Sequence, residues 1–208
     1  MEPTTALLIA DLVGVAVFAA SGASAGVAKR LDVFGVVFIG FVTALGGGIV
    51  RDLVINEFPP LAFADWRYAV VPAFAALLVF WLHPQLIRVQ RFMLLLDAAG
   101  LGLFTAAGTL KALQVGVPVV GACILGMITG IGGGVLRDVL TGEIPVVLRR
   151  EIYAVAALIG AVAVAVGIRL HVPSLAVLLG SAALTGSIRV LAIMRDWSAP
   201  IARDSPRP

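Results

Sequence analysis

Two glycine triplets, each followed by an arginine and an aspartate, stand out in the apolar sequence of this 208-residue chain as a candidate functional motif. They are Gly46, Gly47 and Gly48 before Arg51 and Asp52, and Gly132, Gly133 and Gly134 before Arg137 and Asp138. Each glycine inside a helix costs about 0.8–1.0 kcal/mol relative to alanine. Two such triplets in apolar segments predict broken helices whose freed backbone groups line a hydrated cavity. Close helix packing through small residues is the alternative.

The arginine of each motif lies about one helical turn beyond its last glycine. A charge within a membrane span costs roughly 2.5–3.5 kcal/mol on insertion scales and is normally paired or turned toward water. Adjacent helical residues do not face each other, so we expect ion pairs between the two motifs. The expected pairs are Arg51 with Asp138 or Asp97, and Arg137 with Asp52 or Asp11. Alternatively, both arginines reach water at the membrane interface.

Further polar residues accompany the triplets. Thr43 and Thr129 lie three residues before them and are candidate pore-lining hydroxyls. Asp11 and Asp97 occupy equivalent places in two other apolar segments, either as interfacial caps or as ion or proton sites. Lys111 is either an interfacial anchor or a gating charge.

The composition determines the class of protein that must position these residues. With 61% hydrophobic and 13% charged residues and a mean hydropathy of +1.08, the chain is predicted to be an integral, all-α membrane protein. The net charge of +3 is attributed to topology rather than to binding nucleic acid. A single cysteine, Cys123, excludes an internal disulfide. We expect no metal, no cofactor and no enzymatic activity, because no Ser-His-Asp set, metal-ligand cluster or P-loop is present.

Charged residues separate seven apolar segments long enough to cross a bilayer, which needs roughly 20 residues. The predicted spans are 6–28, 33–56, 68–87, 92–111, 116–141, 152–169 and 173–194, with a flexible tail at 197–208. The side that holds the C-terminus would carry eleven of the fifteen Lys and Arg residues, and positive loops stay in the cytoplasm. The N-terminus is therefore predicted outside and the C-terminus inside. Arg189 is expected to extend to the cytoplasmic interface.

The two motifs belong to an internal repeat with an offset of 86 residues. Ten of the twenty-seven positions are identical between residues 34–60 and 120–146. The chain is therefore predicted to be a single membrane domain with two copies of a three-helix unit, at about 6–87 and 92–169, and a seventh helix at about 173–194. Three is an odd number of spans, so the second copy would be inverted. Inverted repeats are typical of transport folds.

The doubled Gly-Gly-Gly-x-x-Arg-Asp motif and the three-plus-three-plus-one arrangement resemble the prokaryotic trimeric intracellular cation (TRIC) channels over roughly residues 5–195. The resemblance implies a homotrimer with one pore in each subunit and with helices 2 and 5 kinked at the glycine triplets. It also implies potassium-selective conduction that can depend on voltage. The implied pore residues are both triplets and both Arg-Asp pairs.

Two functions follow from these features. The first is a passive potassium channel in the inner membrane, with the pore between the two broken helices. The alternative is a secondary carrier of a small neutral amino acid such as glycine, coupled to protons through Asp11 or Asp97. Domains similar to this one also have a name that suggests glycine transport. Saturable uptake would distinguish a carrier from a channel.

Overall fold

The computed structural model describes residues 3–82, 89–149, 152–195 and 197, and the helices account for most of them. The long helices are α1 (Pro3–Ala28), α2 (Val33–Val54), α4 (Arg67–Leu82), α5 (Val89–Gln114), α6 (Val119–Leu140), α8 (Ile152–Arg169) and α9 (Ser174–Met194). Two single-turn helices, which the sequence did not indicate, are α3 (Leu61–Ala64) and α7 (Val146–Arg149). The predicted tail lies outside the described residues from position 198 onward.

Six of the described helices are long and apolar enough to cross a membrane. They are Thr5–Ala28, Val33–Val54, Met93–Gln114, Val119–Leu140, Ile152–Arg169 and Ser174–Met194. Helix α4 is apolar but has 16 residues, fewer than the roughly 20 that a bilayer requires. The predicted span at 68–87 continues into residues outside the described ranges. The seven-span count therefore stays a prediction.

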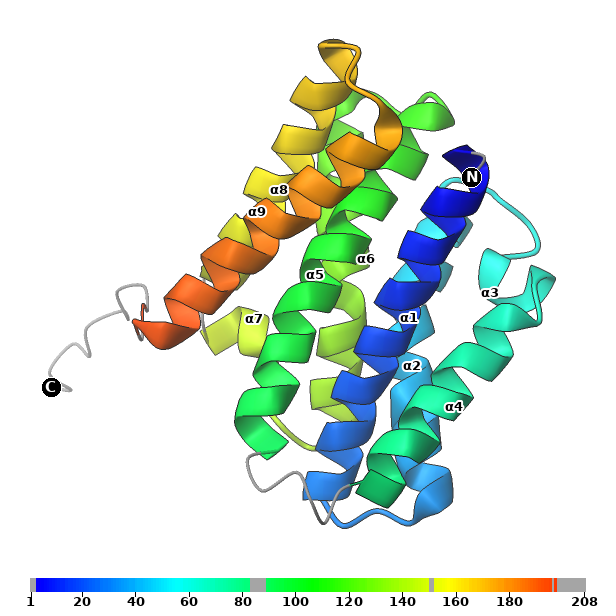
Figure 1. The fold of residues 1–208 in the computed structure, drawn as a ribbon, viewed down its shortest axis with the longest axis vertical. Helices are drawn as coiled ribbons and strands as arrows, with labels where there is room; N and C mark the ends of the chain where they lie inside the picture. The colour runs from blue at the N-terminus through cyan, green and yellow to red at the C-terminus, as the bar shows by residue number, and fades with distance from the viewer. Residues whose placement is uncertain (1–2, 83–88, 150–151, 196, 198–208) are drawn as a thin grey trace, which may run out of the picture.

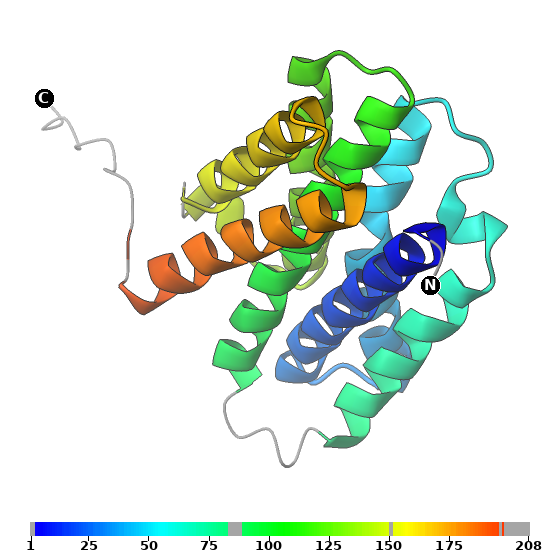
Figure 2. The same cartoon turned by 45° about the horizontal axis from the view of Figure 1, so that its top comes forward.

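The helices form two similar groups of three. Helix α1 packs against α2 and α4, and α5 packs against α6 and α8. In Figure 1, α1 and α4 run downward and α2 upward, whereas α5 and α8 run upward and α6 downward. The groups meet along α1 with α5 and α2 with α6. Helix α9 packs on α5 and α8, beside the second group (Figure 2).

The helix ends repeat with the sequence. Helices α1 and α5 are followed by Arg30 and Gly116, which both have positive φ, and α2 and α6 by Asn56 and Gly142, which also do. Both pairs are 86 residues apart. A left-handed residue after a helix lets the next N–H groups reach back to the last carbonyls, which stops the helix. The helix ends of the two groups therefore have the same backbone conformation, although the residues at these positions differ.

Both glycine triplets lie within uninterrupted helices. Helical structure runs through Gly46–Gly48 in α2 and through Gly132–Gly134 in α6. The prediction that the triplets break these helices is therefore wrong. The reason for the glycines is the close approach of α2 to α6.

Candidate functional site: two arginine-carboxylate clusters beside a helix crossing

Helices α2 and α6 cross with backbone against backbone. A Cβ atom on Gly47 would lie 2.1 Å from the carbonyl oxygen of Thr129, and one on Gly133 would lie 2.0 Å from the carbonyl oxygen of Thr43. These distances are far below any real contact, so only glycine fits at either position. The contact is reciprocal between the two repeats. The packing alternative for the triplets thus accounts for the middle glycines.

Thr43 and Thr129 are buried at this crossing. Their hydroxyl groups donate to carbonyl oxygens of their own helices, Ile39 O and Leu125 O, at 2.7 Å in both cases. Their side chains pack against Gly22 of α1 and Gly108 of α5, where a Cβ atom would clash with them. The small-residue faces of α1 and α5 therefore pack against α2 and α6, as the sequence indicated. Neither threonine lines the two cavities beside the clusters described below.

The first cluster surrounds Asp52, which is almost fully buried. Its Oδ1 accepts from Arg51 Nε at 2.8 Å and from Lys111 Nζ at 3.0 Å. Its Oδ2 accepts from the backbone N–H of Leu61, the first residue of α3, at 3.0 Å. The carboxylate thus neutralises two cations and caps a short helix, where the helix dipole also favours negative charge.

The second cluster repeats this arrangement around Asp138. Its Oδ1 accepts from Arg137 Nε at 2.8 Å, and its Oδ2 accepts from the backbone N–H of Val146, the first residue of α7, at 2.9 Å. Arg137 also donates through Nη1 to Asp97 Oδ1 and to the hydroxyl of Ser21, both at 2.7 Å. The guanidinium is 1% exposed. One buried cation is therefore held by two carboxylates.

The expected pairs between the two motifs are wrong. Arg51 contacts Asp52 rather than Asp138 or Asp97, and Arg137 contacts Asp138 and Asp97 rather than Asp52 or Asp11. On a helix, the Cα–Cβ bonds of adjacent residues point in different directions, but this does not limit where the end of a long side chain can reach. The long arginine side chain curls back, so that its Nε reaches the next carboxylate.

Neither arginine extends to water, as the interfacial alternative required. The side chains of Arg51 and Arg137 are 5% and 1% exposed, so neither reaches water in this structure. Asp97 is 1% exposed and bound to Arg137, so it is not an interfacial cap. Arg189 is 2% exposed and lies over the ring of Tyr153, 4.7 Å from its centroid, instead of extending to the interface.

Ion pairs between the two groups flank both clusters. Lys111 of α5 contacts Asp52 and, at 2.7 Å, Glu57 after α2. Lys29 after α1 contacts Glu143 after α6 at 2.6 Å. Each pair joins one repeat to the other. The ammonium group of Lys111 is thus bound by two carboxylates, those of Asp52 and Glu57. The sequence did not indicate these ion pairs.

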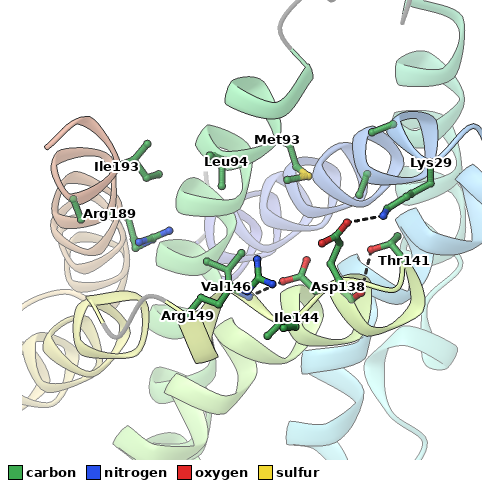
Figure 3. A pocket seen from close by; sticks show the side chains of 14 residues that line it. Lys29, Met93, Leu94, Asp138, Thr141, Ile144, Val146, Arg149, Arg189 and Ile193 are labelled. Atoms are coloured by element: carbon green, nitrogen blue, oxygen red, sulfur yellow. Dashed lines mark hydrogen bonds and ion pairs between the residues drawn. The ribbon is translucent and has the colours of Figure 1, made fainter. Parts of the chain in front are cut away.

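A cavity of about 510 Å³ adjoins the second cluster. Asp138, Thr141 and Glu143 line it together with the basic residues Lys29, Arg149 and Arg189. Figure 3 shows Arg189 at one end and Lys29 at the other, with the apolar Met93 and Leu94 between them. A smaller cavity of about 20 Å³ lies beside the first cluster and is lined by Asp11, Arg51, Asp52 and Tyr68 among others.

Sequence reasoning missed three residues of these clusters, Ser21, Tyr68 and Tyr153, and placed a fourth, Arg189, at the interface instead of beside Tyr153. The Tyr68 hydroxyl donates to Asp11 Oδ2. Tyr68 and Tyr153 are the second residues of α4 and α8, but their offset is 85 rather than 86, so a search in one register does not pair them. Ser21 and Arg189 have no copy in the other repeat. A gapped self-alignment would have found the tyrosines.

Comparison with known proteins assigns the family. The family model described as "Glycine transporter" matches residues 8–84 and again 94–169. A UPF0126 membrane protein of Deinococcus radiodurans is 45% identical over 156 residues, which are 74% of this chain and 73% of that protein. The UPF0126 inner membrane protein YadS of Escherichia coli is 44% identical over 73% of this chain and 74% of its own length. The chain is thus a multi-pass membrane protein similar to inner membrane proteins.

Solved structures share the overall fold of this chain. The TRIC trimeric intracellular cation channel orthologue from Rhodobacter sphaeroides is 36% identical and covers 93% of this chain and 100% of its own, with a TM-score of 0.89. A structure solved to explain conductance through TRIC cation channels is 36% identical and covers 96% of this chain and 98% of its own, with a TM-score of 0.85. Sequence match and shared architecture together show that the chain belongs to the trimeric intracellular cation channel family.

Proposed function

We propose that the protein is a passive channel for monovalent cations, chiefly potassium, with one pore inside each subunit along the crossing of α2 and α6. The observation that carries this proposal is the pair of buried arginine-carboxylate clusters, one beside each repeat's glycine triplet. Its pore residues are Thr43, Gly46–Gly48, Arg51 and Asp52, with Thr129, Gly132–Gly134, Arg137 and Asp138. The likeness to cation channels of known structure supports it.

Arginine beside a cation path is a physical difficulty that the ion pairs resolve. An isolated guanidinium would repel potassium, and charged rings of the opposite sign are what cation pores use. Here Arg51 is neutralised by Asp52, and Arg137 is held by Asp97 and Asp138. Each guanidinium is therefore neutralised where it lies and does not repel a passing cation as an isolated charge would.

The structure represents a closed state in this proposal. The backbone of Gly47 contacts that of Thr129, and Phe18 packs on Phe104 with ring centroids 5.2 Å apart. Opening then requires α2 and α6 to move apart or bend at the triplets, where the absence of side chains leaves few contacts to repack. Buried charges that shift during this movement would make opening depend on voltage.

We further propose a homotrimer with the N-terminus outside and the C-terminus in the cytoplasm. The excess of Lys and Arg on one side of the seven-span topology supports this orientation. Both ion pairs that join the repeats, Lys29–Glu143 and Lys111–Glu57, connect residues that this topology places on the same side. The 510 Å³ cavity then opens toward the cytoplasm.

Liposome flux tests the proposal. Purified protein is reconstituted into vesicles loaded with potassium, and efflux is followed alongside uptake of labelled glycine in the same preparation. Fast efflux that does not saturate, and that is lost in Asp138→Asn and Asp52→Asn but kept in the α9 control Gly180→Ala, is the expected result. Saturable glycine uptake without ion efflux would replace the channel with the carrier that the family description names.

A further inference from the structure

The segment between α2 and α4 lies at the boundary of the membrane. Helix α2 has 22 residues, which span about 33 Å at a rise of about 1.5 Å per residue, and a hydrocarbon core is about 30 Å thick. Helix α4 begins at Arg67 and runs back against α2 in the opposite direction (Figure 1). Residues 55–66, which include α3, therefore turn the chain where hydrocarbon gives way to water.

Three large aromatic side chains of this turn are exposed. Phe58, Phe63 and Trp66 are 76%, 74% and 73% exposed. Exposed apolar groups gathered in one place mark contacts with a membrane or a partner. Tryptophan in particular is enriched at membrane–water interfaces, where its ring lies at the level of the headgroups. The depth of the turn and the type of its side chains thus both indicate a lipid contact.

Local hydrogen bonds hold this turn in one conformation. The N–H of Phe63 donates to Pro60 O at 2.8 Å, and the N–H of Asp65 donates to Leu61 O at 3.3 Å. Arg67 Nε donates to Asp65 Oδ2 at 2.8 Å, so an ion pair closes the turn beside the rings. A preformed surface has little conformational freedom to lose on binding. The rings are therefore presented by a fixed scaffold.

The other side of α3 faces the first cluster. Asp52 Oδ2 accepts from the N–H of Leu61. Leu61 and Ala62 line the cavity of about 20 Å³ together with Asp11 and Arg51. This single-turn helix therefore connects the exposed rings to the buried carboxylate through one hydrogen bond.

The equivalent segment of the second repeat has no such rings. Residues 141–149 contain no aromatic residue. Leu148 takes the place of Phe63 as the third residue of its single-turn helix and is also 74% exposed, and the basic Arg149 follows it. The aromatic surface thus belongs to the first repeat, and Leu148 provides a matched control.

We propose that Phe58, Phe63 and Trp66 form a docking surface for phospholipid, with their rings at the boundary between headgroups and acyl chains, and that this contact holds α3 against the Asp52 cluster. Phospholipid fits better than a second copy of the chain, because the Asp65–Arg67 ion pair beside the rings complements a zwitterionic headgroup. The proposed topology places this contact in the outer leaflet. The contact itself does not depend on ion conduction.

The fluorescence of Trp66 tests the docking surface without changing it. Trp81→Phe combined with Trp197→Phe leaves Trp66 as the only tryptophan. In liposomes, phosphatidylcholine brominated close to the headgroup should quench this fluorescence several-fold more than phosphatidylcholine brominated at the chain end, and aqueous iodide should quench it little. Strong quenching by iodide alone would place Trp66 in water, and quenching by neither agent would mean that another copy of the chain covers it. Either result overturns the proposal.

Thiol labelling tests the link between the rings and the cluster. Ala62→Cys in a Cys123→Ala background lies beside the small cavity, so a water-soluble thiol reagent should label it slowly in liposomes. Adding Phe63→Ser and Trp66→Ser should speed labelling several-fold, because α3 then loses its contact with lipid. Leu148→Ser, the matched change on α7, should leave the rate unchanged.

An unchanged rate after the two serine substitutions, or an equal increase from the control, would reject this link. Neither measurement uses ion flux, so a failed docking surface is distinguishable from a failed channel.

Discussion

The clusters around Asp52 and Asp138 contain the same parts and yet differ in openness. Each has an arginine, an aspartate that caps a one-turn helix, a tyrosine, and a lysine from the other repeat. In the first, Lys111 reaches Asp52 itself and is 21% exposed, whereas Lys29 stops at Glu143 and is 40% exposed. Lys111 aligns with Ala25, so Lys29, which follows the end of α1, lies four residues beyond the equivalent position. The lysine that binds the aspartate of the first cluster is thus displaced by four residues in the second, whose aspartate lines the 510 Å³ cavity.

The largest expected effect is a loss of stability when either middle glycine of the crossing is replaced. It tests whether the two repeats contribute equally to the contact between α2 and α6. Gly47→Ala and Gly133→Ala each place a methyl group about 2 Å from a backbone carbonyl oxygen. Overpacking of this kind costs typically 1–3 kcal/mol and occasionally more. Both should lower the thermal unfolding midpoint in detergent to a similar extent. Gly180→Ala, which meets no atom within 4 Å, is the control and should not. Strongly unequal losses from the first two changes would show that the crossing is not symmetric.

The next effect distinguishes the two arginines. Arg137→Met leaves the buried Asp97 without its cationic partner, and breaking a buried ion pair costs about 3–5 kcal/mol. Arg51→Met should destabilise less, because Asp52 keeps Lys111. The difference in unfolding free energy between the variants is the measurement. A greater loss from Arg51→Met would mean that Lys111 does not bind Asp52 in the membrane.

Moving the lysine of the second cluster by four residues tests whether its position determines the size of the cavity. The double variant Ala25→Lys with Lys29→Ala gives the second cluster the register of the first. The new ammonium group should reach Asp138, fill much of the cavity and lower potassium efflux several-fold. Lys29→Ala alone is the control and should change efflux little. Unimpaired efflux in the double variant would place the pathway elsewhere.

The smallest effect is a dependence on pH at the cavity mouth. Lys29 holds the pKa of Glu143 below its usual value through a hydrogen bond and its charge. A lowered pKa in the folded state means that this ion pair stabilises the protein above the ordinary glutamate pKa and is lost as pH falls through the lowered one. Glu143→Gln should remove that part of the acid dependence of stability. Because the pair is exposed, high salt should weaken it as well. Identical acid profiles for the two proteins would contradict this assignment.

Sequence patterns predicted the class of fold and most of the cluster residues, for identifiable reasons. Hydropathy located the apolar helices, and the 86-residue register located Arg51, Arg137 and both aspartates that follow them. The partners of Arg51 and Arg137 were mispredicted because the helical spacing rule ignores the reach of a long side chain. Glycine propensity alone could not distinguish a broken helix from a close crossing, since the neighbour that requires Gly47 is Thr129, on another helix. Arg189 lies in a helix without a repeat partner, so no internal comparison identified it.

The reciprocal contact at the crossing also bears on the origin of the chain. Gly47 contacts Thr129 and Gly133 contacts Thr43. Thr129 is the repeat equivalent of Thr43, so both repeats make the same contact with each other. A self-complementary interface of this kind is what two identical subunits related by a two-fold axis form. A protein of half this length, inserted into the membrane in both orientations, could form the same crossing as an antiparallel homodimer. Fusion of two copies of the gene would then have allowed each half to diverge. Lys29 and Lys111, which are not at equivalent positions of the two repeats, are examples of such divergence.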